Sequence, residues 1–164
     1  MSAAVEFPDM DYEMIHLSGA WARERYVKTR KLEMGTQAVQ SLAGTGSSSE
    51  QNPFIALKRP HTTEDTGEVF GFSFVYSGNF LAQVEVSTYE MTRVMMGINP
   101  QGFSWELSRD EEFQTPEVVM VYSDKGLNGM SQAYHRLYRD RLMRGKWRNH
   151  ARPILSITGK RPIL

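Results

Sequence analysis

The sequence predicts a mostly β protein: an antiparallel β-sandwich followed by one α-helix near the C-terminus. Two observations lead to this prediction. Between residues 52 and 123, short segments rich in β-branched and aromatic residues alternate with turn-forming residues. They recur about every ten residues, a spacing typical of sandwiches and barrels. After residue 126, the apolar period changes from two residues to the period of a helix.

The first third of the chain contains weaker strand signals. We expect residues 1–9 to be poorly ordered and residues 11–20 and 35–42 to form strands. The polar segment 21–32 predicts either a strand with one solvent-exposed face or a short helix, because its periodicity does not distinguish the two. Residues 42–53 are rich in Gly and Ser and predict a loop, either a flexible linker or an ordered loop near a binding face.

The central part of the chain has the strongest strand signals. Strands are expected at 54–58, 68–76, 80–86, 92–98, 103–107 and 118–122. Segment 68–76 alternates strictly and places four aromatic residues on one face. A sugar-stacking platform is one interpretation of this row, but packing between two sheets explains it better. A turn is predicted at 60–67 and a tight hairpin connection at 77–79.

A helix is expected over residues 126–143. Its apolar stripe consists of Leu127, Met130, Tyr134, Leu137 and Tyr138. Ser123 or Asp124 can cap its N-terminus, and Gly145 can end it.

Composition narrows the possible classes of function. Among 164 residues, 19 basic residues balance 19 acidic ones, so net charge does not attract the chain to nucleic acid or membranes. Cysteine is absent, which excludes disulfides, thiolate zinc sites and a cysteine nucleophile. We find no secretory signal. No apolar run approaches the length of about 20 residues that a membrane-spanning helix needs. We therefore expect a cytoplasmic protein with no membrane partner.

Positive charge is concentrated between residues 136 and 161. Nine basic residues in this region face a single acidic residue, Asp140. They are Arg136, Arg139, Arg141, Arg144, Lys146, Arg148, Arg152, Lys160 and Arg161. A nucleic-acid patch and a solvated helix face that meets an acidic partner are both open interpretations. No nucleic-acid motif accompanies the charges, which favours the solvated face and no nucleic-acid partner.

The residues alone predict no catalytic, cofactor-binding or metal-binding site. The four histidines are His16, His61, His135 and His150. They lack metal-ligand spacing, and no phosphate-binding or nucleophile-elbow motif is present. The adjacent carboxylates at 64–65 and 111–112 point to opposite faces of an extended chain. They therefore do not form acid–base pairs and are expected in solvated turns.

Five phrases occur in order over roughly residues 8–155. They are LSGAWARERYVKTRKLEMGTQ, SSSEQNPFIALKRP, GFSFVYSGNFLAQVEV, FQTPEVVMVYSDKGLNGMSQAYHRLYRDRLMRGKW and RPIL. Together they resemble the N-terminal region of the large α-galactosidases of glycoside hydrolase family 36. The resemblance implies the later part of a β-supersandwich over 1–125, a linker helix over 126–145, and an extended tail over 146–164 at the start of a (β/α)₈ barrel.

The family resemblance also implies an activity for the full-length enzyme. That activity is retaining hydrolysis of terminal α-galactosides such as melibiose and raffinose by two aspartates of the barrel. Neither aspartate can be assigned to a residue here, so we expect a scaffold that is inactive alone. The resemblance further implies a homo-oligomer for the full-length family. We expect no cofactor.

This sequence departs from the family pattern at two places. After the first RPIL the family continues into an Asn-Trp-Glu-Ala signature, whereas this chain continues as SITGKRPIL. Glu50 stands where the family loop usually has a histidine, which weighs against a substrate-side role for this loop.

Eight residues in the most family-like phrases are expected to serve packing and turn geometry. Their alternative role is to shape a domain or subunit interface. They are Trp21, Arg23, Arg25, Asn52, Phe54, Ser77, Asn79 and Phe80.

Two other functions remain open. A stand-alone carbohydrate-binding sandwich predicts a row of exposed aromatic side chains. An interaction module that uses the basic helix predicts partner binding with a strong salt dependence. If the chain hydrolyses α-galactosides alone, Glu85, Glu112 and Asp124 are the carboxylates to test.

Overall fold

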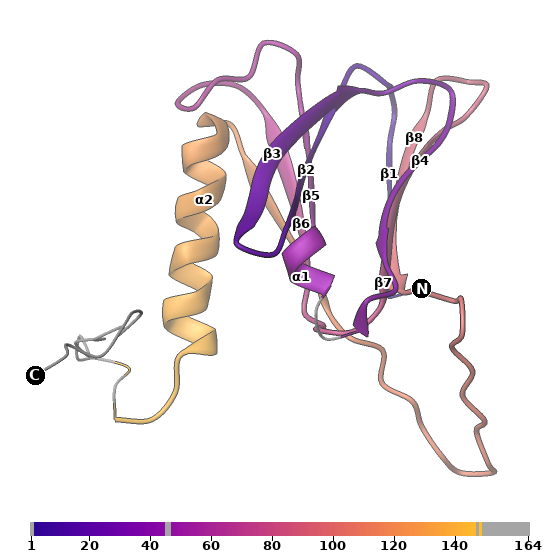
Figure 1. Ribbon diagram of the computed structural model, residues 1–164. Helices are drawn as coiled ribbons and strands as arrows, with labels where there is room; N and C mark the ends of the chain where they lie inside the picture. Colours follow the sequence, from indigo (N-terminus) through magenta and orange to yellow (C-terminus); the bar gives the residue numbers. More distant parts are fainter. Residues whose placement is uncertain (1, 45–46, 147, 149–164) are drawn as a thin grey trace, which may run out of the picture.

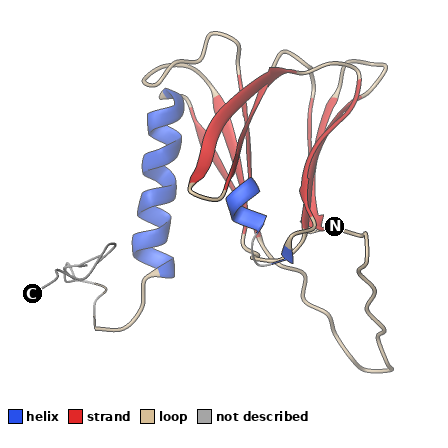
Figure 2. Cartoon of the chain, viewed as in Figure 1, coloured by secondary structure: helices blue, strands red, loops and turns tan. Residues whose placement is uncertain are grey.

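Two antiparallel sheets face each other, and one long helix covers the outer face of one sheet (Figure 1). The computed structural model describes residues 2–44, 47–146 and 148. The predicted sandwich followed by a helix near the C-terminus is confirmed, as the distribution of strands and helices in Figure 2 shows. The expected tail over 146–164 lies almost wholly outside the described residues, as do His150, Arg152, Lys160 and Arg161.

The sheets contain four and five strands, and neighbouring strands in both are antiparallel. The four-stranded sheet has the order β1 (Ala3–Phe7), β8 (Thr92–Ile98), β7 (Phe80–Val86) and β4 (Gly35–Ser41). The five-stranded sheet has the order β3 (Arg23–Lys31), β2 (Glu13–Ala20), β5 (Gln51–Lys58), β6 (Val69–Phe74) and β9 (Val118–Ser123). The helices are the short α1 (Ser47–Glu50) and α2 (Gly126–Leu137), and α2 continues into a π-helical turn over Tyr138–Leu142.

The first hydrophobic core fills the space between the two sheets. Along β7 every second residue is buried, as expected for a strand with one face in a core. Phe72 and Phe74 of β6 enter this core from the five-stranded sheet and are almost fully buried. The predicted core role of the aromatic row is thus confirmed for these residues. Tyr76 lies beyond the end of β6 and is 37% exposed.

A second core lies between the five-stranded sheet and α2. Met130 and Tyr134 of α2 pack there against Val69 of β6 and Ala56 of β5. Gly71 makes this close approach possible. A Cβ atom added at Gly71 would lie 2.6 Å from the Met130 sulfur and 2.9 Å from the Tyr134 ring. Strand β6 is therefore buried on both faces, one in each core.

Two of the predicted elements are wrong. Residues 1–9 were expected to be poorly ordered, but within the described residues 2–9 β1 pairs with β8 and places Val5 and Phe7 against the first core. Residues 103–107 form no strand, and in the described part of the chain they pair with no other strand. Their alternating pattern is genuine, but a strand also needs a neighbour that satisfies its backbone groups.

The structure also defines two segments whose conformation the sequence left open. The predicted loop 42–53 contains α1 and the first residues of β5. The ambiguous segment 21–32 forms β3, an edge strand whose residues are all exposed. Because neither face of β3 is buried, its hydrophobic pattern could not distinguish strand from helix.

The expected side-chain caps of α2 are also wrong. Ser123 accepts a hydrogen bond from the Lys125 amide, and no side chain caps the first turn of the helix. Gly145 does not end the helix either, since the helical segment stops at Leu142 and Met143 is already extended.

Backbone carbonyls of the 60–67 turn cap α2 instead. The bonds run from the Gly126 amide to the Gly67 carbonyl (3.0 Å), from Leu127 to Thr63 (3.1 Å) and from Asn128 to Glu64 (2.8 Å). The first amides of a helix have no partner within the helix, so an external acceptor is required. The 60–67 turn therefore fixes both the position and the direction of α2.

Replacing Gly71 tests the packing of α2. Gly71→Val should push Met130 and Tyr134 away from the sheet and lower the free energy of unfolding by about 1–3 kcal/mol, the usual cost of overpacking. Urea denaturation measures this loss. The matched control is Ala38→Val at an exposed position of β4, which should change stability by less than about 0.5 kcal/mol. Equal stability of the two variants would contradict the close contact.

Candidate functional site

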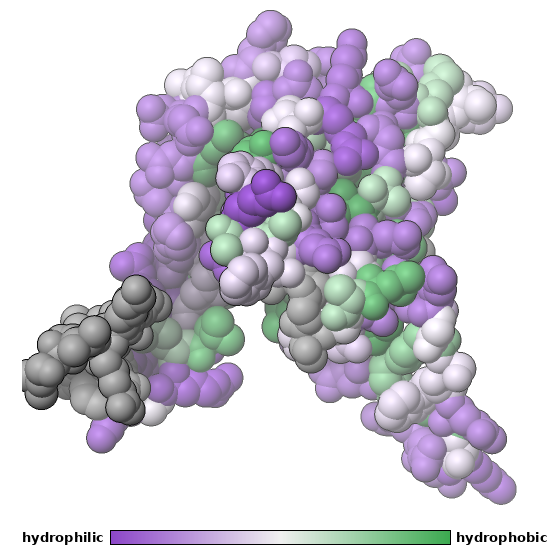
Figure 3. All heavy atoms as spheres, in the orientation of Figure 1, coloured by the Kyte–Doolittle hydropathy of each residue, from purple (hydrophilic) through white to green (hydrophobic). Residues whose placement is uncertain are grey.

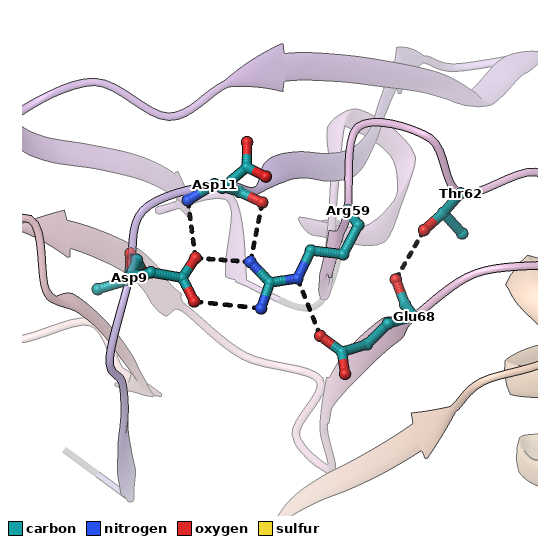
Figure 4. Close-up of polar contacts among 6 residues, drawn as sticks. Asp9, Asp11, Arg59, Thr62 and Glu68 are labelled. Atoms are coloured by element: carbon teal, nitrogen blue, oxygen red, sulfur yellow. Dashed lines mark hydrogen bonds and ion pairs between the residues drawn. The ribbon is translucent and has the colours of Figure 1, made fainter.

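Arg59, one residue beyond β5, is the centre of a polar cluster (Figure 4). Its guanidinium donates two parallel hydrogen bonds to the Asp9 carboxylate, at 2.6 and 3.1 Å. It also donates to the Asp11 carbonyl at 3.2 Å and to the Glu68 carboxylate at 3.0 Å. The guanidinium carbon lies 4.0 Å from the centre of the Tyr12 ring, a cation–π contact.

The electrostatics of this cluster favour a structural role. The hydrogen bond from Arg59 lowers the pKa of Asp9, and the bond to Asp9 raises the pKa of Arg59. Burial raises the pKa of Tyr12 to about 12. All three groups therefore keep one protonation state around neutral pH. General acid–base catalysis needs a group that titrates near the working pH, which these groups do not provide.

The Arg59 cluster connects to the cap of α2. The Arg59 amide and the Thr62 hydroxyl both donate to the Glu68 carbonyl, at 3.1 and 2.8 Å. These bonds close the 60–67 turn, whose carbonyls hold the first amides of α2. Gly67 is required inside the turn, because its φ is +100° and an added Cβ would lie 2.7 Å from Thr62. A continuous set of contacts thus runs from the β1–β2 connection to the helix.

His16 forms a second buried polar group, on β2. Its Nε2 atom lies 2.8 Å from an Arg30 nitrogen, and because a guanidinium can only donate, Nε2 accepts this bond. Its proton therefore resides on Nδ1. Both His16 Nδ1 and Gln51 Oε1 are buried with no hydrogen-bond partner among the described residues. Burial, together with the Arg30 and Lys28 charges, lowers the pKa of His16 below its usual 6.5.

The residues from the family-like phrases do not form a single site. Trp21, Arg23 and Arg25 lie at the exposed β2–β3 turn, where Trp21 is 86% exposed. Asn52 and Phe54 belong to β5. The Phe54 ring packs against the Tyr134 ring, and the centres of the two rings are 6.0 Å apart.

The remaining three residues serve the β6–β7 connection. Ser77 is exposed, and Phe80 is fully buried in the first core. The Asn79 side-chain oxygen accepts a hydrogen bond from the Gly44 amide at 2.7 Å. Packing and turn geometry are therefore the visible roles of Phe54, Asn79 and Phe80.

Other candidate residues are scattered over the described part of the chain. Glu85 lies 3.9 Å from Arg93 on the outer face of the four-stranded sheet, whereas Glu112 and Asp124 are exposed in different connections. His61 and His135 are exposed. In the described ranges, no three His, Asp or Glu side chains gather closely enough to hold a metal ion. No described helix is long and apolar enough to cross a membrane.

A cavity of about 230 Å³ near the β6–β7 connection bears on the alternative that the chain is a carbohydrate-binding module. It is lined by Tyr76, Asn79, Asn99 and Phe103, among others, a mixture that could suit a sugar. Asn99, however, already donates to Gln40 and to the Phe80 carbonyl and accepts from the Gln101 amide. Because the buried amide is used internally, the cavity gives little support to sugar binding.

Sequence reasoning missed the residues that join the sandwich to the helix. Arg59 lies within the phrase NPFIALKRP, and Gly71 lies inside the alternating segment 68–76. A glycine inside a strand signals a close backbone approach, so Gly71 could have been singled out. The partners of Arg59 are 50 residues away in sequence at Asp9 and have no local signal.

Two family models match the chain. The glycosyl hydrolase family 36 N-terminal domain matches residues 1–108, and the melibiase model matches residues 112–159. The chain belongs to glycosyl hydrolase family 36, as part of the N-terminal domain region of its α-galactosidases.

Named relatives agree with this assignment. The chain is 61% identical over 155 residues to α-galactosidase AgaA of Geobacillus stearothermophilus, covering 94% of this chain and 21% of the relative. It is 46% identical to α-galactosidase Mel36A of Lactobacillus acidophilus over 94% of this chain, again covering 21% of the relative. The chain thus spans about a fifth of the length of these relatives.

Solved structures show the same fold. The crystal structure of AgaA superposes with a TM-score of 0.88 at 60% identity and covers 92% of this chain and 21% of that chain. An α-galactosidase from Lactobacillus brevis superposes with a TM-score of 0.82 at 44% identity and covers 85% of this chain and 19% of that chain. The AgaA variants were crystallised with stachyose and with raffinose.

Removing Arg59 tests the polar cluster. Arg59→Leu leaves Asp9 and Glu68 without their shared partner and should lower the free energy of unfolding by about 2 kcal/mol. The matched control is Arg93→Leu, whose side chain is 50% exposed and pairs with Glu6 on an open sheet face. This control should cost clearly less than Arg59→Leu, because water screens an exposed ion pair. If chemical denaturation gives the same loss for both variants, Arg59 is an ordinary surface residue.

The lowered pKa of His16 predicts a loss of stability in mild acid. The folded state keeps His16 neutral while the unfolded state binds a proton below its usual pKa of 6.5. Stability is therefore complete above that pH and falls as pH drops toward the folded-state pKa. Asp9 has its pKa below 3.8 and does not contribute in this window. Urea midpoints at about pH 7.5 and 5.5 should differ less for His16→Gln than for the native chain. An unchanged difference would contradict the assignment.

Proposed function

We propose that this chain is the scaffold that positions the start of the catalytic region in an α-galactosidase. The observation behind the proposal is the place where the two family matches meet. The melibiase match begins at residue 112 and includes β9 and α2. Strand β9 pairs with β6 in the sandwich, and α2 packs on the same sheet. The chain leading into the catalytic region is therefore built into the sandwich rather than tethered to it.

The proposed substrates of the whole enzyme are oligosaccharides with a terminal α-galactosyl group, such as raffinose and melibiose. The support comes from relatives, since AgaA variants were crystallised with raffinose and stachyose. A retaining mechanism in this family would use two carboxylates about 5 Å apart. Glu85, Glu112 and Asp124 are distributed over a sheet face, a loop and the β9–α2 connection, so this chain is proposed to be inactive alone.

The scaffold proposal predicts that the isolated chain does not hydrolyse α-galactosides, and that an enzyme is active when this chain is joined to the remaining domains of a relative. The purified chain should not hydrolyse p-nitrophenyl-α-galactoside. A chimera that carries this chain in place of the matching region of AgaA should hydrolyse raffinose at a rate close to that of the parent. Release of galactose measures both reactions. Turnover by the isolated chain, or a well-folded but inactive chimera, would contradict the proposal.

A matched pair of variants separates positioning from folding in the chimera. Gly71→Val should reduce raffinose hydrolysis because it displaces α2, whereas Ala38→Val should leave hydrolysis unchanged. Both chimeras must first show thermal unfolding above the assay temperature. If the folded Gly71→Val chimera is as active as the Ala38→Val chimera, the packing of α2 on the five-stranded sheet does not position the catalytic region.

A further inference from the structure

Residues 103–117 form an extended arm that projects beyond the end of the four-stranded sheet (Figure 1), and in the space-filling view of the same orientation it stands clear of the rest of the molecule (Figure 3). Nearly all of its residues are exposed, including Trp105 at 61%. Its first part, 103–107, has the alternation of a strand but pairs with no strand in the described ranges. The arm is acidic, with five acidic residues and one basic residue.

The arm is folded on itself rather than a featureless loop. The Phe113 ring lies 4.9 Å from Trp105 and 6.0 Å from Phe103 between ring centres, which holds the two limbs together. At the tip, the Ser108 amide donates to the Glu111 carboxylate at 3.0 Å, and the Glu111 amide donates to the Ser108 carbonyl at 3.2 Å. A segment that is already shaped loses less conformational entropy when it binds.

Strand β3 has the opposite character. It is a sheet edge of nine residues, all exposed, and it contains five basic residues and one acidic residue. From Tyr26 to Lys31, where β3 pairs regularly with β2, the other side of its backbone faces no strand in the described ranges. Such an edge is a template for another strand. Tyr26 and Val27 add apolar contact area and are 56% and 64% exposed.

The β2–β3 hairpin holds this edge in place. The turn is closed at Gly19, where an added Cβ would lie 2.4 Å from the Arg23 carbonyl oxygen. The Ala22 amide donates to the Glu24 carboxylate at 3.0 Å. The bond to His16 fixes Arg30 from the buried side.

The other three sheet edges lack this combination. Strands β4 and β9 contain no charged residue, and β1 contains only Glu6, which is paired with Arg93. The end of α2 is also basic, but a helix offers no row of unpaired backbone groups to a strand. Among the described elements, only β3 combines a free edge with positive charge.

We propose that the acidic arm of one copy of this chain docks along β3 of a second copy. Segment 103–107 adds a strand to the five-stranded sheet, a recurring mode of recognition in which backbone hydrogen bonds provide affinity. The opposite charges select β3 over the other edges and speed the encounter. The contact joins two different surfaces, so each copy offers both an arm and an acceptor edge.

Sedimentation velocity of the purified chain tests this contact. At low salt the chain should self-associate as its concentration rises, and about 0.5 M NaCl should weaken association about tenfold or more by screening. A chain that stays monomeric at every concentration at low salt would overturn the proposal and would assign both surfaces to other parts of a longer polypeptide. Association that ignores salt would also overturn it.

Charge exchange shows whether these two surfaces make the contact. Glu106→Lys with Glu112→Lys in the arm, or Lys28→Glu with Lys31→Glu in β3, should each abolish self-association. An equimolar mixture of the two double variants should associate again, because the native arm of the β3 variant meets the native β3 of the arm variant, and the two reversed surfaces also carry opposite charges. Variants that had lost their whole fold could not regain binding in this way. The control Arg139→Glu with Arg141→Glu, in the basic π-helical turn that follows α2, should associate normally. Loss of association in this control, or no recovery in the mixture, would contradict the contact.

Discussion

The anchoring of α2 on the five-stranded sheet is the constraint on which the rest of the structure depends. Three amides at the start of the helix are held by carbonyls of the 60–67 turn, and two side chains of the helix fill the space that Gly71 leaves open. An isolated helix of this length is only marginally stable in water, so α2 depends on its contacts with the rest of the fold. These contacts are the backbone bonds to the turn and the side-chain packing over Gly71. The direction in which the chain leaves the sandwich is therefore set by the 60–67 turn and by Gly71.

The two hydrophobic cores are coupled because they share β6. Phe72 belongs to the first core and Val69 to the second, so a shift of β6 would disturb both. The Arg59 cluster supports the same region from its edge, joining the β1–β2 connection to the turn that caps α2. Partly buried, charge-assisted hydrogen bonds contribute more than exposed pairs do, because the charged groups have less access to water. The sandwich thus supports the helix through packing and through polar contacts.

Periodicity predicted the parts of this fold that bury one face. The alternation around Phe72 and the helical stripe around Met130 both depend on local spacing, and both hold in the structure. Contacts between distant segments have no such signature, so the pairing of β1, the capping of α2 by backbone carbonyls and the cluster around Arg59 were not foreseen. Residues 103–107 show the opposite case, since they have a strand pattern without a strand partner in the described chain.

Native-state hydrogen exchange at the first turn of α2 tests the central claim most directly. Amides at helix ends usually exchange by local fraying, with little protection. If the 60–67 turn anchors the helix, the amides of Leu127 and Asn128 should be protected as strongly as amides in the centres of β5 and β6. Rapid exchange of these two amides while the sheet remains protected would show that the helix start is free. The proposed role of the sandwich as a rigid support would then fail.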